Sequence, residues 1–290
     1  MDWRRRYYAV LPLLLVALLP SGCRTHRQLA IDDLVVEHQV PLQWSELEPG
    51  LSFARLEYHH QNDNDRVVVA AVRAEPTGYD FELLDAPDLL KEPRADVDAL
   101  AVKAGVTAAG NASFYLPETF NPNGLIVAGR KVKNEWKKGG GSGVFWVKDG
   151  KAVIDWSRTF RPEWEQADLA VQAGPLVIEP DGLPGIRSNT GKYEARTIIG
   201  LDDRQRVVLA CTLREDGNGE RLRGLDLYEL MRILSVSSDR GGRGLRSALN
   251  LDGGVSTGFF LKSPRLSMMV KVINPVRNGI GLRPRGKPWK

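Results

Sequence analysis

The sequence predicts an α+β fold, with a mixed, mostly antiparallel and twisted β-sheet core and a few flanking helices. Short β-branched and apolar runs recur along the chain, as at residues 67–72 and 81–84, and this composition is typical of strands. Other such runs fold back on themselves around polar turns. Apolar residues repeat with a clear helical period in only two segments. Strands therefore form the body of the fold, and helices flank it.

Two hairpins are predicted from turn chemistry. Residues 144–156 contain β-rich halves on either side of Asp149-Gly150, a pair that favours a tight hairpin turn. Residues 197–212 repeat the arrangement around Asp202-Asp203. Hairpins join neighbouring antiparallel strands, so both segments favour an antiparallel sheet.

Two helices are predicted from apolar periodicity and end signals. Residues 94–104 carry an apolar face and precede Gly105, a typical helix stop. Residues 227–234 place apolar side chains at i, i+3, i+4 and i+7, after Asp226 and with Glu229 in the first turn. This is a capping-box-like start, so Asp226 is interpreted as an N-cap.

The N-terminus predicts the cellular compartment. Residues 1–22 contain three consecutive arginines and then an apolar stretch that is too short to span a bilayer. Small residues lead to Cys23, and the segment resembles a bacterial lipoprotein signal peptide whose cysteine becomes the lipidated first residue. Lipoproteins retained at the inner membrane often have aspartate directly after the cysteine, and this chain has Arg24 there. We therefore expect a lipid-anchored protein of the bacterial cell envelope, at the outer membrane and facing the periplasm.

The rest of the 290-residue chain is predicted to consist of three parts. We expect a lipid-proximal tether and N-terminal segment over residues 23–59, one domain over residues 60–284, and a basic tail over residues 285–290. The signal arginines and the tail inflate the formal net charge of +4. The chain has no basic stripe with interleaved aromatic residues, so no nucleic-acid partner is predicted.

The cysteine and histidine pattern disfavours several chemistries. Cys211 is the one cysteine left after processing, and its β-rich surroundings predict a buried small hydrophobe without a disulfide. The four histidines lie in the first quarter of the chain, at His26, His38, His59 and His60. Cysteine–histidine catalysis and a multi-histidine zinc site are therefore disfavoured. The sequence indicates no required cofactor, and leaves a divalent metal and the oligomeric state open.

The segment 248–257 is the most informative for function. An apolar run leads into a double-glycine turn followed by hydroxyl groups. Its polar and glycine residues are Asn250, Asp252, Gly253, Gly254, Ser256 and Thr257. Glycines at a strand end permit positive φ and close approach of a ligand, while the polar side chains supply an acid and hydrogen-bonding groups. An Asp-Gly pair is also common in ordinary hairpin turns, so the pattern alone fits a site or a plain turn.

Five segments together resemble one family. They are residues 111–115, 172–178, 196–200, 224–234 and 248–257. In this order they resemble the phosphodiester glycosidase family, over about residues 60–284. The resemblance implies hydrolysis of the bond between a sugar and a phosphodiester. Such cleavage develops positive charge on the sugar and negative charge on the departing phosphate.

The predicted catalytic residues are Asp252, Arg196 and Asn111. Asp252 is the carboxylate, acting as nucleophile, base or electrostatic stabiliser. Arg196 offers a planar fork for a phosphate, and Asn111 orients sugar hydroxyls or phosphate oxygens. The predicted substrate-binding residues are Asn250, Gly253, Gly254, Ser256, Thr257, Gly174 and Phe114.

Each role has a structural alternative. Arg196 also fits a surface ion pair at a strand end. Asn111 and Asn250 also fit turn formers that satisfy the backbone, and Phe114 also fits the core or a pocket wall. These alternatives are decided by where each side chain points.

This chain departs from the family pattern at several positions. Ala112 and Ser113 stand at glycine positions, Val255 stands at the third glycine of the second motif, and Thr257 replaces a serine. The first hypothesis is an envelope-anchored glycosidase that hydrolyses a glycosyl-phosphodiester bond in an exopolysaccharide or cell-envelope glycan. Its partners are then that glycan and, through the N-terminal lipid, the membrane. One alternative is a non-catalytic glycan-binding lipoprotein with a degenerate site. Another is a transglycosylase of envelope polymer, which uses the same residues and differs only in the acceptor.

Overall fold

The computed structural model of the chain describes residues 44–59, 66–214, 224–235 and 244–286. The predicted signal peptide, the lipidation site Cys23 and residues 287–290 of the predicted basic tail lie outside these ranges. Among the helices in the described ranges, none has the length and apolar character needed to cross a membrane.

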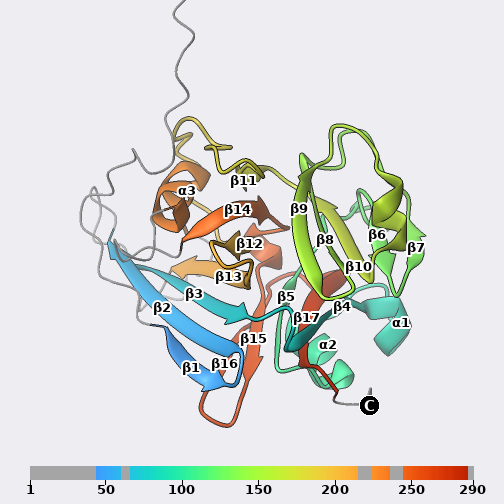
Figure 1. The fold of residues 1–290 in the computed structure, drawn as a ribbon, viewed down its shortest axis with the longest axis horizontal. Coiled ribbons are helices and arrows are strands. Elements are labelled where there is room, and N and C mark those ends of the chain that lie inside the picture. The colour runs from blue at the N-terminus through green and yellow to red at the C-terminus, as the bar shows by residue number, and fades with distance from the viewer. Residues whose placement is uncertain (1–43, 60–65, 215–223, 236–243, 287–290) are drawn as a thin grey trace, which may run out of the picture.

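The described strands form three sheets, and every strand pair within them is antiparallel (Figure 1). The seven-stranded sheet has the order β1 (Ser45–Glu48), β2 (Leu51–His59), β3 (Arg66–Ala74), β13 (Val207–Arg214), β12 (Arg196–Asp202), β14 (Leu245–Asn250), β11 (Leu176–Ile178). The second sheet has the order β7 (Lys131–Asn134), β6 (Ile126–Ala128), β10 (Leu169–Ala173), β8 (Gly143–Lys148), β9 (Lys151–Trp156). The third sheet has the order β16 (Ser267–Val270), β15 (Phe259–Lys262), β5 (Ala108–Asn111), β17 (Asn278–Pro284), β4 (Tyr79–Asp85).

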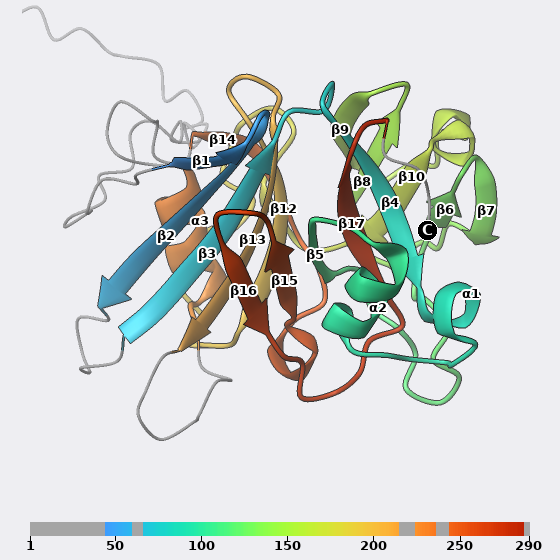
Figure 2. The same ribbon diagram turned by 90° about the horizontal axis from the view of Figure 1, so that it is seen from below.

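Helical segments are short and lie outside the sheets (Figures 1 and 2). They are α1 (Ala86–Leu90), α2 (Val97–Ala104), η2 (Pro162–Gln166), α3 (Leu227–Ser235) and η4 (Gly254–Ser256). α2 packs on the third sheet through Leu100, and α3 packs on the seven-stranded sheet through Leu230 and Leu234. The predicted α+β class with a mostly antiparallel core is confirmed.

The main core lies where the three sheets meet. Val72 and Leu209 from the seven-stranded sheet, Phe145 from the second and Ile280 from the third belong to one buried cluster. The rings of Phe81 and Phe145 pack edge to face with centroids 6.5 Å apart, a favourable geometry for aromatic pairs. One shared core makes the sheets a common scaffold for the strand ends.

The predicted hairpins are confirmed, and the helix predicted at residues 94–104 is present but begins at Val97, because Ala95 forms a β-bridge with Val276. β8 and β9 form the hairpin around Asp149-Gly150, where both residues have positive φ, and β12 and β13 form the second hairpin. α2 ends at Gly105, which has a φ of 70°. The sheet begins at Ser45, so its first two strands lie within the segment predicted as tether and N-terminal segment.

Two predicted structural roles are also confirmed. The Asp226 carboxylate accepts a hydrogen bond from Tyr228 N at 2.8 Å, as an N-cap of α3 does. Burial raises the pKa of Asp226, but hydrogen bonds from Tyr228, Thr190 and Lys192 outweigh it and lower the pKa overall. Cys211 is fully buried on β13, and burial raises its pKa to about 12. Its thiol is therefore a packing group.

The topology brings several strand ends together. β14 ends at Asn250 beside the start of β12, because these strands are antiparallel. β5 ends at Asn111 beside the start of β17 for the same reason. Asp252 N donates to Ala112 O at 2.9 Å and so joins the two sheets at this point. The predicted site motifs therefore meet although they are distant in sequence.

Candidate active site

The loop after β14 holds the candidate carboxylate. The half-buried Asp252 carboxylate accepts hydrogen bonds from Gly253 N, at 2.9 Å, and from the Ser256 hydroxyl. Burial raises the pKa of Asp252 to about 6, although both hydrogen bonds favour the ionised form. Asp252 is therefore an acid that titrates close to neutrality, as acid–base and nucleophilic groups in active sites often do.

Asn111 holds this loop in place. Its Nδ2 donates to Asp252 O at 2.6 Å, while its Oδ1 accepts from Thr197 Oγ1 at 2.5 Å and Gly258 N at 3.0 Å. Asn111 is fully buried, and both ends of its amide are engaged within the protein. We infer that it positions the Asp252 loop and does not contact the substrate. Thr197 was missed by the sequence reasoning, although it directly follows Arg196 in a recognised segment.

The glycine pair serves two different purposes. Gly254 has a φ of 59°, in the left-handed region that favours glycine. Gly253 has an extended φ of −154°. However, a Cβ atom on Gly253 would lie 2.9 Å from Ala195 O. Gly253 is therefore needed for close packing of the loop against the start of β12.

Gly253→Ala is expected to lower kcat/KM by roughly 10- to 100-fold, because a displacement of about 1 Å in a catalytic group can cost 100-fold. The added methyl meets a backbone oxygen and forces the loop to shift. Gly78→Ala is the matched control, because its Cβ meets its nearest neighbour at an ordinary 3.7 Å. Steady-state kinetics of both variants test this. Equal kcat/KM values for Gly253→Ala and Gly78→Ala would show that the close contact at Gly253 does not affect activity.

Arg196 sits beside the loop, and its guanidinium is largely engaged locally. Nη2 donates to Lys192 O at 3.0 Å, and Nη1 lies 3.2 Å from Glu194 Oε2. The side chain is only 12% exposed, and its buried Nε has no hydrogen-bond partner in the part of the chain that the structure describes. Burial lowers the pKa of Arg196, against the charges of Glu194 and Asp226. The ion pair with Glu194, which the structural alternative predicted for Arg196, is therefore present.

Further unpartnered polar atoms gather around this point. Asn250 Nδ2 donates to Gly174 O at 3.0 Å and Leu251 O at 2.8 Å, but Asn250 Oδ1 is buried without a partner. Thr257 Oγ1 is likewise buried and unpartnered. Burying such atoms costs free energy. Together with Arg196 Nε, they are three buried polar atoms around the Asp252 loop that lack a hydrogen-bond partner among the described residues.

Asn278, at the start of β17, was missed by the sequence reasoning. Its Oδ1 accepts from Ser113 N and Ser113 Oγ, both at 3.0 Å. This fixes the amide orientation and leaves the buried Nδ2 without a partner. The sequence signal is an asparagine as the first residue of an apolar strand, β17. Its geometry adds a fourth unpartnered atom to those of Arg196, Asn250 and Thr257.

The other predicted binding residues have structural roles. Gly174 accepts from Asn250, and a Cβ on it would lie 2.7 Å from Ser142 N, so close packing requires a glycine there. Phe114 is partly buried and packs against the main core. This placement favours the alternative of a core or pocket-wall residue for Phe114.

The departures from the family pattern fit the local backbone. Ala112, Ser113 and Val255 are not among the residues with positive φ. Ala112 is fully buried, Ser113 bonds to Asn278, and Val255 is 38% exposed on the loop surface. None of these positions therefore requires the conformational freedom of glycine.

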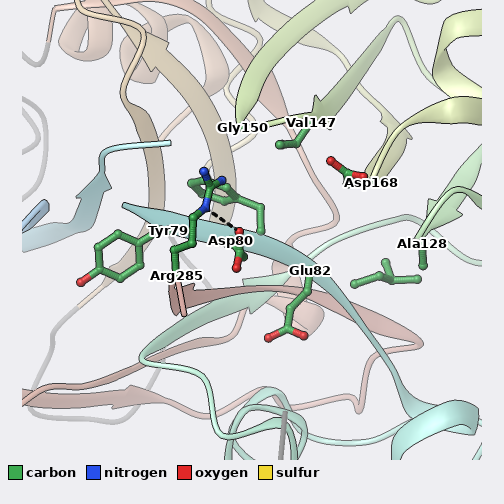
Figure 3. Close-up of a pocket in the computed structure, with 11 residues that line it drawn as sticks. Tyr79, Asp80, Glu82, Ala128, Val147, Gly150, Asp168 and Arg285 are labelled. Atoms are coloured by element: carbon green, nitrogen blue, oxygen red, sulfur yellow. Dashed lines mark hydrogen bonds and ion pairs between the residues drawn. The ribbon is translucent and has the colours of Figure 1, made fainter. Parts of the chain in front are cut away.

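A separate hollow of about 290 Å³ lies between β4, β17 and the second sheet (Figure 3). Arg285 pairs with Asp80 at 2.9 Å on one side, and Asp168 on the other side pairs with Arg130 at 2.9 Å. None of the sequence-predicted site residues lines it. Its charged groups already have partners, so the candidate active site remains at the Asp252 loop.

Residues 101–283 match the sequence model of the phosphodiester glycosidase family. The match covers more than half of the 290 residues. The chain therefore belongs to the phosphodiester glycosidase family, whose members are hydrolases of sugar phosphodiesters.

Two solved structures are similar in fold. One is the zebrafish N-acetylglucosamine-1-phosphodiester alpha-N-acetylglucosaminidase catalytic domain auto-inhibited by its pro-peptide, with 14% identity and a TM-score of 0.59, over 85% of this chain and 89% of that chain. The other is a hypothetical protein from Synechocystis, with 15% identity and a TM-score of 0.54, over 85% of this chain and 64% of that chain. At these identities the similarity shows the fold alone. A search of the curated proteins finds no match.

Proposed function

We propose that this protein hydrolyses a glycosyl phosphodiester, breaking the bond between the anomeric carbon and the phosphate oxygen. The observation that carries the proposal is the setting of Asp252, whose carboxylate has a raised pKa and lies among unpartnered polar atoms. Those four atoms come from three parts of the chain, at Arg196, in the segment 248–257 and at Asn278. The expected ligand has both acceptor oxygens and hydroxyl groups, as a sugar phosphodiester does.

The roles follow from the charges that develop in the reaction. Ionised Asp252 acts on the sugar side, as nucleophile, base or electrostatic stabiliser of the oxocarbenium-like transition state. Arg196 Nε and Asn278 Nδ2 are donors suited to the phosphate oxygens, and Asn250 Oδ1 is an acceptor suited to a sugar hydroxyl. Water adds its hydroxyl to the anomeric carbon, and the phosphate monoester leaves as an anion.

We further propose the envelope as its place of action and an exopolysaccharide or cell-envelope glycan as its substrate. The signal-like segment 1–22 and the lipobox-like Cys23 support this proposal. A mature chain anchored by lipid at the outer membrane meets phosphodiester-linked sugars of the envelope at short range. Metabolic labelling with a palmitate analogue tests the anchor, and labelling that survives Cys23→Ser would contradict it.

Product release tests the activity. The soluble domain, starting after Cys23, is incubated with sugar-1-phosphodiesters and envelope glycans, and free sugar is measured. Release of sugar supports the hydrolase. Ligand binding without turnover would favour the alternative, a glycan-binding lipoprotein with a degenerate site.

The pH profile distinguishes the carboxylate roles. Because the reaction requires ionised Asp252 and its pKa is about 6, kcat/KM is expected to be constant above about pH 7 and to fall roughly tenfold per unit below about pH 6. The measurement is the pH dependence of kcat/KM in buffers of constant ionic strength. Activity that instead falls as pH rises through 6 would identify Asp252 as a general acid.

A further inference from the structure

A small apolar hollow adjoins the Asp252 loop on the side of β13 and β16. Its volume is about 10 Å³, which is room for one methyl- or methylene-sized group. Ala195, Leu213 and Val270 line the hollow and are buried, and Val255 and Ile273 also line it. Val255 and Ile273 are 38% and 57% exposed, so they form an open apolar rim.

The rim is built into the candidate active site. Ile273 N donates to Val255 O at 2.9 Å, which ties the rim to the apex of the loop. Gly254 N donates to Ala195 O at 2.7 Å and ties the loop to the residue before Arg196. A group in the hollow is therefore only a few residues from Asp252 along one fixed loop.

Two polar groups of the hollow complement an anion. Thr257 lines it, and its buried Oγ1 has no partner. Lys271 lines it as well and is exposed. A phosphate at the junction with the Asp252 loop matches both the hydroxyl donor and the cation.

The apolar walls exclude a sugar ring as the occupant. A sugar carries several hydroxyl groups, and each one buried without a partner costs free energy. The hollow offers one unpartnered side-chain hydroxyl among aliphatic side chains. An alkyl group attached to the phosphate loses nothing there and gains from burial.

We propose that this hollow is the aglycone subsite, and that it selects glycosyl phosphodiesters whose phosphate carries an alkyl chain. The inference rests on the proposed function and deepens it, by naming the group on the far side of the scissile bond. One group of the alkyl chain enters the hollow and the sugar lies toward Asp252. The phosphate between them accepts from Thr257 and Lys271 in addition to the Arg196 and Asn278 donors.

The test compares two substrates with one sugar. The probes are the methyl and hexyl phosphodiesters of N-acetylglucosamine 1-phosphate, and kcat/KM is measured for each. Because the hollow has room for one such group, burial of one further methylene group corresponds to about a fourfold preference for hexyl. Val255→Ser combined with Ile273→Ser is expected to bring the hexyl-to-methyl ratio near one. Val102→Ser, an exposed valine on α2 outside the hollow, keeps the wild-type ratio.

A binding measurement separates this inference from the proposed function. Affinities of hexyl phosphate and methyl phosphate are measured by calorimetry for the same proteins. If the wild type binds hexyl phosphate more tightly than methyl phosphate and the double variant does not, the subsite is supported. If no sugar is released in that case, the proposed function fails but the subsite proposal does not. Equal kcat/KM values or equal affinities for the hexyl and methyl compounds would overturn the proposed subsite. If the wild type sediments as a dimer, the double variant as a monomer, and neither prefers the hexyl compound, the rim would be a self-association surface instead.

Discussion

Asp252→Asn is expected to lower kcat by roughly 10²- to 10⁴-fold, the usual contribution of a catalytic acid–base group. The asparagine has the same shape and keeps an oxygen that can accept from Gly253 N, so the loop retains its shape. It removes only the negative charge that the reaction uses. Single-turnover and steady-state kinetics on the purified domain measure the loss. A variant with more than a tenth of wild-type kcat would remove Asp252 from the mechanism.

The stability of the same variant provides its control. Burial raises the pKa of Asp252 to about 6, above the ordinary 3.8, so the folded state disfavours the ionised form. At pH 7.5 the wild type bears this penalty, and it is relieved as pH falls from about 6 toward 3.8. Asp252→Asn is therefore expected to have an equal or higher Tm at pH 7.5, and the difference shrinks at pH 5. A lower Tm at pH 7.5 would show that the carboxylate has a structural role.

Asn111→Ala is expected to affect stability and activity together. The substitution leaves Gly258 N, Thr197 Oγ1 and Asp252 O without their buried partner. This is expected to destabilise the domain by roughly 2–4 kcal/mol, since each unsatisfied buried group costs about 1–3 kcal/mol before relaxation. Loss of the loop position lowers kcat/KM by about 100-fold or more. Urea unfolding and kinetics are the measurements.

Two further variants keep this prediction informative if Asn111→Ala does not fold. Thr197→Val removes one of the three hydrogen bonds with little change of shape, and a fall in kcat of several-fold with a small loss of stability is expected. Asn134→Ala breaks the hydrogen bonds to Pro122 O and Gly124 O in the second sheet, away from Asp252. It is expected to lower stability without changing kcat. Equal kinetic effects of the two variants would mean that Asn111 supports the fold in general and not the loop.

The local elements of this fold follow from the sequence because their causes are local. The turn at Asp149-Gly150, the stop at Gly105 and the cap at Asp226 each depend on residues within a few positions. The sheet order does not follow in the same way. β13 pairs with β3, and β11 pairs with β14, and no local pattern encodes partners so far apart.

The candidate site was predicted as a set of residues, but their roles depend on long-range contacts. Asn111 reaches Asp252 across 141 positions, and Asn278 reaches Ser113 across 165 positions. Spacing cannot show such contacts. It also cannot show that the Arg196 fork faces Lys192 and Glu194 while Nε is left unpartnered. The family resemblance located the motifs, and only the packing showed which of their polar atoms already have partners within the described residues.

The central claim is that the bond to the anomeric carbon breaks, and hydrolysis in ¹⁸O-labelled water tests it most directly. A glycosyl phosphodiester that is turned over is incubated in labelled water, and the masses of the released sugar and phosphate monoester are determined. Attack at the anomeric carbon places the label in the sugar, which is the result expected for the site around Asp252. Label in the phosphate monoester would show cleavage of the phosphorus–oxygen bond and would contradict the glycosidase mechanism.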